Sequence, residues 1–125
     1  MAERVTIRVN EVVGGGLCVA TDDGQKVHDR IAKAIRAGRD VSLSFLNVDS
    51  LTSAFLNAAV GQLYADFSQE QVRQRLSVAD IGPEDTGLLK RVVETAKEYF
   101  KDPSRFDEAR REVLGAGDDD DGATD

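Results

Sequence analysis

The alternation of apolar and polar positions predicts short strands along the first two thirds of the chain. In Arg4–Val9 every second residue is apolar, and the same alternation recurs in Val41–Phe45. Leu76–Ala79 is short enough to be another strand of the same sheet. Leu17–Ala20 follows Gly14–Gly16, and three glycines that interrupt two apolar runs favour a hairpin. We therefore expect the first two strands to pair with each other.

Apolar residues at helical spacing predict three helices between and after these strands. They extend from a cap at Asp22 or Asp23 to about Ala37, from Thr52 or Ser53 to about Phe67, and from about Thr86 to Phe100. Gly61 lies within the second helix at a cost of about 1 kcal/mol relative to alanine, which predicts close packing against the sheet. Asp66–Arg75 is expected to be a surface turn. A short helix at about Arg105–Leu114 follows the helix-breaking Pro103.

This order of elements predicts an α/β fold in which helices pack against a mixed four-stranded sheet. A length of 125 residues and a hydrophobic share of 41% suit one domain with a single core. We assign residues 1–114 to this domain. Residues 115–125, composed almost entirely of Gly, Ala and Asp, are predicted to form a disordered acidic tail.

The net charge of −7 is concentrated at the C-terminus. Asp118–Asp121 and Asp125 contribute −5, which leaves the domain near −2. This balance disfavours nucleic acids and anionic membranes as partners. No apolar run reaches the roughly 20 residues that span a bilayer, and the first residues lack the layout of a signal peptide. We expect a soluble cytoplasmic protein.

An enzyme would have to use Cys18 or His28, and neither residue lies in a sequence motif of catalytic or metal-binding residues. Cys18 is the only cysteine and lies in an apolar stretch, which indicates a small buried side chain. His28 lies beside the apolar stripe of its helix and is predicted at the surface or its boundary. Zinc needs three or four ligands, and no Gly-Lys-Ser/Thr follows Gly14–Gly16 as in a P-loop. We therefore expect no catalytic residues, metal site or cofactor.

The junction Val41–Phe67 carries the clearest functional signal. An alternating strand ends, a polar turn with Asp49 and Ser50 follows, and a helix opens with Thr52 and Ser53. Unpaired backbone N–H groups and the helix dipole favour a phosphate at such a start. Plain capping by one of these hydroxyl side chains is the alternative explanation.

This junction resembles the STAS domains of bacterial anti-sigma factor antagonists and, more closely, the STAS-like family of unknown function. The resemblance extends more weakly over about Arg4–Phe100. The matching elements are a strand ending in Phe45, then Val48 in a short turn, Ser53-Ala54-Phe55-Leu56 at the helix start, and Ala59, Gly61, Gln62 and Leu63.

The resemblance implies a non-enzymatic regulatory domain that binds a protein partner. In the antagonist family a serine at this helix start is phosphorylated by a histidine-kinase-like ATPase, and that position is Ser53 here. The family usually has aspartate before this serine and glycine two residues after it, where this chain has Thr52 and Phe55. The expected partner-binding residues are Asp49, Ser50, Thr52, Ser53 and Asn57.

A nucleotide- or small-ligand-binding domain is the alternative function. It would use the Gly14–Gly16 turn or the start of the Ser53 helix, since both offer backbone N–H groups to a phosphate.

Overall fold

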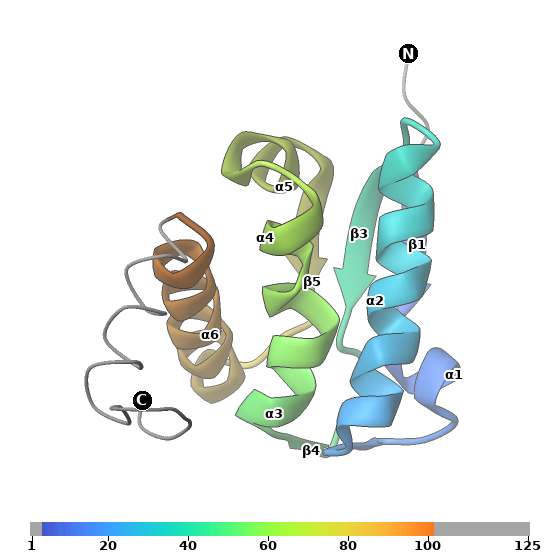
Figure 1. The fold of residues 1–125 in the computed structure, drawn as a ribbon. Helices are drawn as coiled ribbons and strands as arrows, with labels where there is room; N and C mark the ends of the chain where they lie inside the picture. Colours follow the sequence, from blue (N-terminus) through green and yellow to red (C-terminus); the bar gives the residue numbers. More distant parts are fainter. Residues whose placement is uncertain (1–3, 102–125) are drawn as a thin grey trace, which may run out of the picture.

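The structure, a computed structural model, describes residues 4–101. The elements are, in chain order, β1 (Arg4–Arg8), α1 (Val9–Val13), β2 (Leu17–Cys18), α2 (Thr21–Arg36), β3 (Asp40–Ser44), β4 (Ser50–Leu51), α3 (Ser53–Leu56), the π-helical turn η1 (Asn57–Gly61), α4 (Leu63–Asp66), α5 (Gln69–Arg75), β5 (Leu76–Ala79) and α6 (Pro83–Lys101) (Figure 1). The predicted helix at Arg105–Leu114 and the acidic tail lie outside the described residues.

The main sheet has three parallel strands in the order β1-β3-β5. Val5 lies opposite Val41, and Val41 lies opposite Leu76, so the predicted alternation brings apolar residues together across all three strands. The α/β class is confirmed, but the mixed four-stranded sheet is wrong. The reason is that β2 does not join this sheet and instead pairs with β4 in a separate two-stranded parallel sheet.

The predicted hairpin between the first two strands is also wrong. Residues Val9–Val13 form the short helix α1, so the chain leaves β1 before it can fold back beside it. Gly14 ends α1 with a φ of 92°, and its N–H donates to Asn10 O at 2.9 Å. A left-handed φ is accessible to glycine at little cost, so this residue acts as a helix C-cap rather than as part of a hairpin turn.

Helix α2 packs along the sheet with Val27, Ile31 and Ile35 in the core. Its start differs from the prediction, because the N-cap residue is Ala20 and no side chain caps the helix. Asp22 and Asp23 lie one and two residues inside the helix, where their charge favours the positive end of the dipole.

His28 of α2 is buried, with 7% of its surface exposed, which contradicts the predicted surface or boundary position. Its Nε2 lies 3.2 Å from Asp66 Oδ2 at the end of α4, and Arg36 approaches the same carboxylate oxygen at 3.8 Å. Asp66 is 38 positions away in sequence, and its carboxylate gives the buried Nε2 a polar partner, whereas the buried Nδ1 has no hydrogen-bond partner within residues 4–101. The pair joins α2 to α4.

The segments α3, η1 and α4 follow one another as the predicted central helix, interrupted by one wide turn. The N–H of Gln62 donates to Asn57 O, five residues earlier, at 3.0 Å, which defines the π-helical turn. Gly61 does not face the sheet as expected. A Cβ at Gly61 would lie 2.5 Å from Asn57 Oδ1, whereas Val92 of α6 would be at an ordinary contact distance of 3.6 Å, so the missing side chain makes room for the Asn57 side chain.

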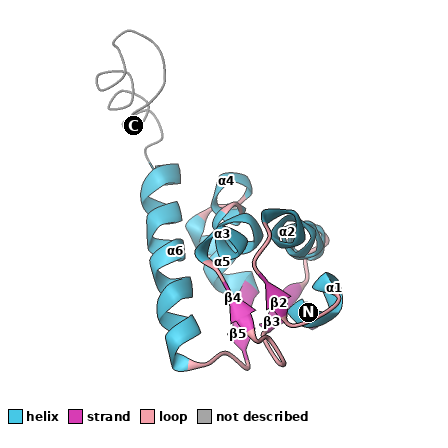
Figure 2. Cartoon of the chain, turned by 90° about the horizontal axis from the view of Figure 1, so that it is seen from below, coloured by secondary structure: helices cyan, strands magenta, loops and turns pink. Residues whose placement is uncertain are grey.

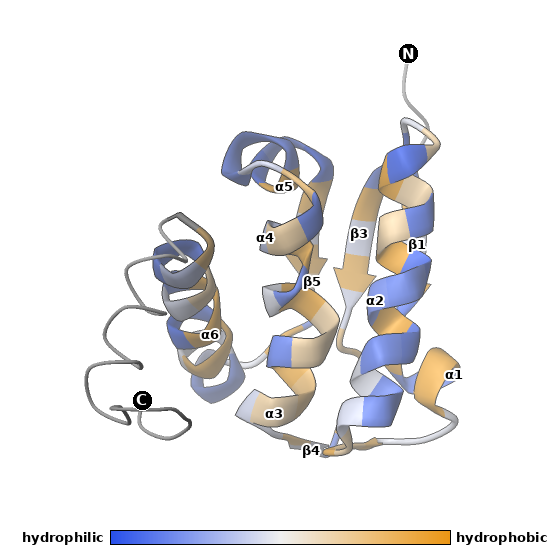
Figure 3. Cartoon of the chain, viewed as in Figure 1, coloured by the Kyte–Doolittle hydropathy of each residue, from blue (hydrophilic) through white to orange (hydrophobic). Residues whose placement is uncertain are grey.

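The last two helices complete the structure beside this central segment. The predicted surface turn Asp66–Arg75 contains α5, which begins with a capping box formed by Ser68 and Gln71. Helix α6 begins at Pro83, three residues earlier than predicted, and packs against α3, η1 and α4. Helices α2 to α5 lie on one side of the three-stranded sheet (Figure 2). Helix α5 is largely hydrophilic, whereas α1 and α3 are largely apolar (Figure 3).

Candidate functional site

The polar turn before α3 is held in place by the segment around Gly16. The N–H groups of Asp49 and Ser50 both donate to Gly16 O, at 2.9 and 3.1 Å. A Cβ at Gly16 would collide with the Asp49 carboxylate and would lie 2.9 Å from Asn47 O. The glycine is therefore needed for a close approach. Asp49 and Ser50 are both exposed; Ser50 begins β4 and pairs with Leu17, and Asp49 directly precedes this strand.

Thr52 is the residue that caps α3. Its Oγ1 accepts a hydrogen bond from the N–H of Phe55 at 3.2 Å and donates one to Val19 O at 3.1 Å. One hydroxyl thus satisfies a free helix donor and ties the helix start to the end of β2. The capping role falls on Thr52 rather than on Ser53, and the Ser53 side chain is exposed.

Ser53 lines a groove between the α3–η1 segment and α6. The groove has a volume of about 580 Å³. Ala54, half-buried Leu88 and buried Val92 supply its apolar surface, while Ser53, Asn57, Arg91 and Thr95 supply its polar rim. An apolar floor with a few polar groups at the rim is the usual composition of a site that binds a side chain or a small molecule.

Arg91 gives this groove its positive charge. Its side chain is exposed, and it forms no ion pair with any residue of the described range 4–101. A guanidinium offers five N–H donors in a planar fork that matches carboxylate and phosphate groups. Ser53, Asn57 and Arg91 together can bind an anionic group that enters the groove.

The predicted site residues therefore separate into three groups. Ser53 and Asn57 both line the groove, Thr52 is a cap, and Asp49 and Ser50 lie at the start of β4. The opposite wall, from α6, was not predicted as part of a site. Its residues Leu88, Arg91 and Thr95 recur at intervals of three and four, which places them on one helix face. The sequence shows this spacing, but it does not show that this face of α6 lies opposite α3 and η1.

Cys18 is not suited to be a nucleophile. Its side chain is fully buried and unpaired with another cysteine, as predicted. Burial, together with the nearby carboxylates of Asp23 and Asp49, raises the pKa of the thiol above its ordinary value of 9.0. The reactive thiolate form is thereby disfavoured.

The raised pKa of Cys18 predicts a loss of stability at alkaline pH. The unfolded thiol loses its proton near pH 9, while the folded thiol retains it, so the free energy of unfolding falls as the pH rises above this value. Urea unfolding between pH 8 and 10 should show this fall in the wild type and a weaker one in Cys18→Ala. Equal slopes in the two proteins would contradict the prediction. The range stops at pH 10 because burial also raises the pKa of Tyr64 from 10.0.

Three observations concern metal ions, phosphate groups and membranes. The described residues contain no group of three or more His, Cys, Asp and Glu side chains that could hold a metal ion. A phosphate at the Gly14–Gly16 turn would meet the Asp49 carboxylate that lies against Gly16, which argues against a nucleotide site at this turn. Within residues 4–101, no helix has both the length and the apolar character needed to cross a membrane.

Fold and groove together define a small α/β domain with a groove between the α3–η1 segment and α6. The chain belongs to the family described as the STAS-like domain of unknown function (DUF4325), whose profile matches residues 23–86. No curated protein and no solved structure matches the chain. The matched segment includes the Ser53 wall of the groove and ends before Arg91.

Proposed function

We propose that the protein is a non-enzymatic regulatory domain that binds a protein partner through the groove between α3–η1 and α6, and that phosphorylation of Ser53 controls this binding. The observation that carries the proposal is the division of roles at the helix start. Thr52 performs the capping, so the exposed hydroxyl of Ser53 is available at the rim of a partly apolar groove.

Phosphorylation would change this groove strongly. A phosphoserine adds a charge of about −1.5 to −2 and three acceptor oxygens. On Ser53 it would face Arg91, which lines the same groove and has no competing ion pair within the described residues. The phosphate would thus occupy the polar rim and bring charge to a surface where a partner buries apolar groups. Partner release is the expected consequence.

The resemblance to anti-sigma factor antagonists suggests a histidine-kinase-like ATPase as the partner and kinase. In the proposed reaction, the γ-phosphoryl group of ATP moves to Ser53 Oγ. A P–O bond forms at the serine, the bond to ADP breaks, and the hydroxyl proton passes to a base of the kinase. The domain itself contributes only the acceptor oxygen and the docking surface.

The test uses purified histidine-kinase-like ATPases from the source organism, each incubated with the full-length protein and ATP. Intact-mass analysis and peptide mapping should locate one phosphoryl group on Ser53, and Ser53→Ala should remain unmodified. Calorimetry should then show that phosphorylation weakens binding to the same ATPase at least about tenfold, equivalent to about 1.4 kcal/mol. Stable modification elsewhere, with no binding of the unmodified protein, would refute the proposal.

Ser50 provides a matched control for the effect of charge. It is exposed near the same helix start, but it lies on β4 and does not line the groove. Ser53→Asp should weaken partner binding, whereas Ser50→Asp, with the same added charge, should leave it within about twofold. Equal weakening by both variants would mean that the net charge of the region, rather than the groove, determines binding.

A further inference from the structure

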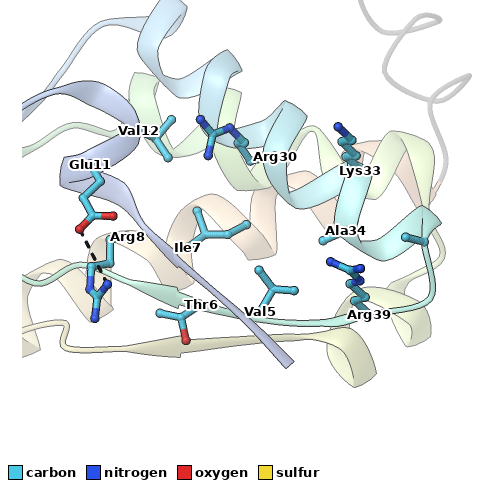
Figure 4. A pocket seen from close by; sticks show the side chains of 11 residues that line it. Val5, Thr6, Ile7, Arg8, Glu11, Val12, Arg30, Lys33, Ala34 and Arg39 are labelled. Carbon is cyan, nitrogen blue, oxygen red and sulfur yellow. Dashed lines mark ion pairs between the residues drawn. The ribbon is translucent and has the colours of Figure 1, made fainter. Parts of the chain in front are cut away.

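A second groove follows the free edge of the three-stranded sheet. β1 is an edge strand, and no strand of the described range 4–101 pairs with its outer side. The groove has a volume of about 500 Å³ and is lined by the successive residues Val5–Arg8, with helices α1 and α2 as its walls (Figure 4). Because both odd and even residues of the strand line it, the groove follows the strand's hydrogen-bonding edge rather than one face of the sheet.

The charged side chains that line this groove are mostly basic. Arg30 and Lys33 project from α2, are exposed, and form no ion pair with any described residue. Arg8 also lines the groove, and its contact with Glu11 is a long and exposed 3.8 Å pair (Figure 4). Exposed pairs of this kind contribute little, so the local field remains positive. This contrasts with residues 4–101 as a whole, where thirteen basic side chains balance thirteen acidic ones.

A second copy of this chain is a poor occupant of the groove. Antiparallel pairing of two β1 strands about Thr6 would place Arg4 of each copy opposite Arg8 of the other. Like charges directly opposite each other destabilise a strand pair, and basic residues on an edge strand are a common device against self-association. The same arginines favour a strand that carries acidic side chains.

We infer that this groove binds an extended segment of a partner protein, added beside β1 as a fourth strand, in which acidic side chains alternate with small apolar ones. Unpaired backbone groups of β1 would supply the hydrogen bonds. The two sets would point to opposite faces of the extended sheet. The acidic side chains would lie on the face that α2 covers and meet Arg30 and Lys33, and the apolar ones would lie on the other face, beside the exposed Thr6. Figure 1 places β1 and α2 on the opposite side of the molecule from α6, so this surface is separate from the Ser53 groove.

The probe is a fluorescein-labelled peptide of sequence Glu-Val-Asp-Val-Glu-Val-Asp, titrated with the full-length protein at low salt. We expect saturable binding that weakens as salt increases, and none for the peptide with lysine at the acidic positions. Arg30→Glu combined with Lys33→Glu should weaken binding at least about tenfold. Arg73→Glu combined with Lys90→Glu makes the same change of charge on exposed residues outside the groove and should leave binding within about twofold.

Hydrogen exchange separates strand addition from simple charge attraction. Those amides of β1 that point away from β3 should exchange at least about tenfold more slowly in the peptide complex, while the exposed turns of α6 should be unaffected. The inference is overturned by a lack of binding at millimolar peptide, by binding that the Arg30 and Lys33 variant leaves unchanged, or by binding without protection of β1. Dimerisation of the free protein with protection of β1 would overturn it in favour of self-association.

Discussion

Phe55→Ala is expected to lower the free energy of unfolding by about 3–5 kcal/mol. Phe55 is fully buried and is the largest such side chain in the described structure. Truncation removes its apolar contacts and leaves a cavity, because a close-packed core relaxes only partly. Since a domain of this size has about 5–15 kcal/mol of stability in total, this one substitution removes a large share of it.

Urea unfolding monitored by circular dichroism measures this loss, with an unchanged dependence on denaturant concentration as the sign that the native state is otherwise intact. Phe55→Leu keeps most of the volume and should cost less than about 1.5 kcal/mol. Ser53→Ala, two residues away but exposed, should stay within about 0.5 kcal/mol of the wild type. A loss below about 1 kcal/mol for Phe55→Ala would show that the side chain is not packed as described.

Phe55 and Thr52 anchor the helix start on either side of Ser53. The large side chain of Phe55 points into the core while its backbone N–H is held by Thr52. The buried side chain of Phe55 and the cap at Thr52 therefore hold the helix start in place. Ser53, which is near both, remains exposed.

The sequence predicted those strands and helices in which burial gives the apolar residues a regular spacing. Alternation in Arg4–Val9 and Val41–Phe45, and the helical spacing in α2 and the central helix, identified strands and helices correctly because burial imposes a period on each. The pairing of β2 was not predictable in this way. A strand of two residues has no period, and the glycines before it mark an interruption without specifying the direction in which the chain continues.

Only the wall of the groove formed by α3 and η1 was predicted, because its residues lie close together in sequence. Ser53 and Asn57 lie four residues apart on one helix, so local spacing brings them together. Their neighbours Arg91 and Thr95 come from a helix more than thirty positions later, and no local rule indicates which helices face each other. The burial of His28 was missed because it depends on Asp66, an equally distant residue.

At Gly24, α2 packs directly against the backbone of the helical segment that carries Ser53. A Cβ at Gly24 would lie 2.6 Å from the Phe55 carbonyl oxygen and 2.9 Å from Ala58 Cβ. Backbone and Cβ atoms cannot move aside as the end of a flexible side chain can, so α3 and η1 would have to shift. Gly24→Ala is therefore expected to destabilise the protein by about 1–3 kcal/mol, even though alanine has the higher helix propensity.

Gly87→Ala is the matched comparison, because the same substitution in α6 meets no atom within 4 Å. Here the propensity gain is not opposed, and the protein should become more stable by about 0.5–1 kcal/mol. Urea midpoints of the two variants should thus move in opposite directions. Stabilisation by both would mean that α2 and the central helix are not in close contact. With opposite signs, Gly24 is identified as the residue that sets the distance between α2 and the helix presenting Ser53, and Gly24→Ala should then also weaken partner binding while Gly87→Ala preserves it.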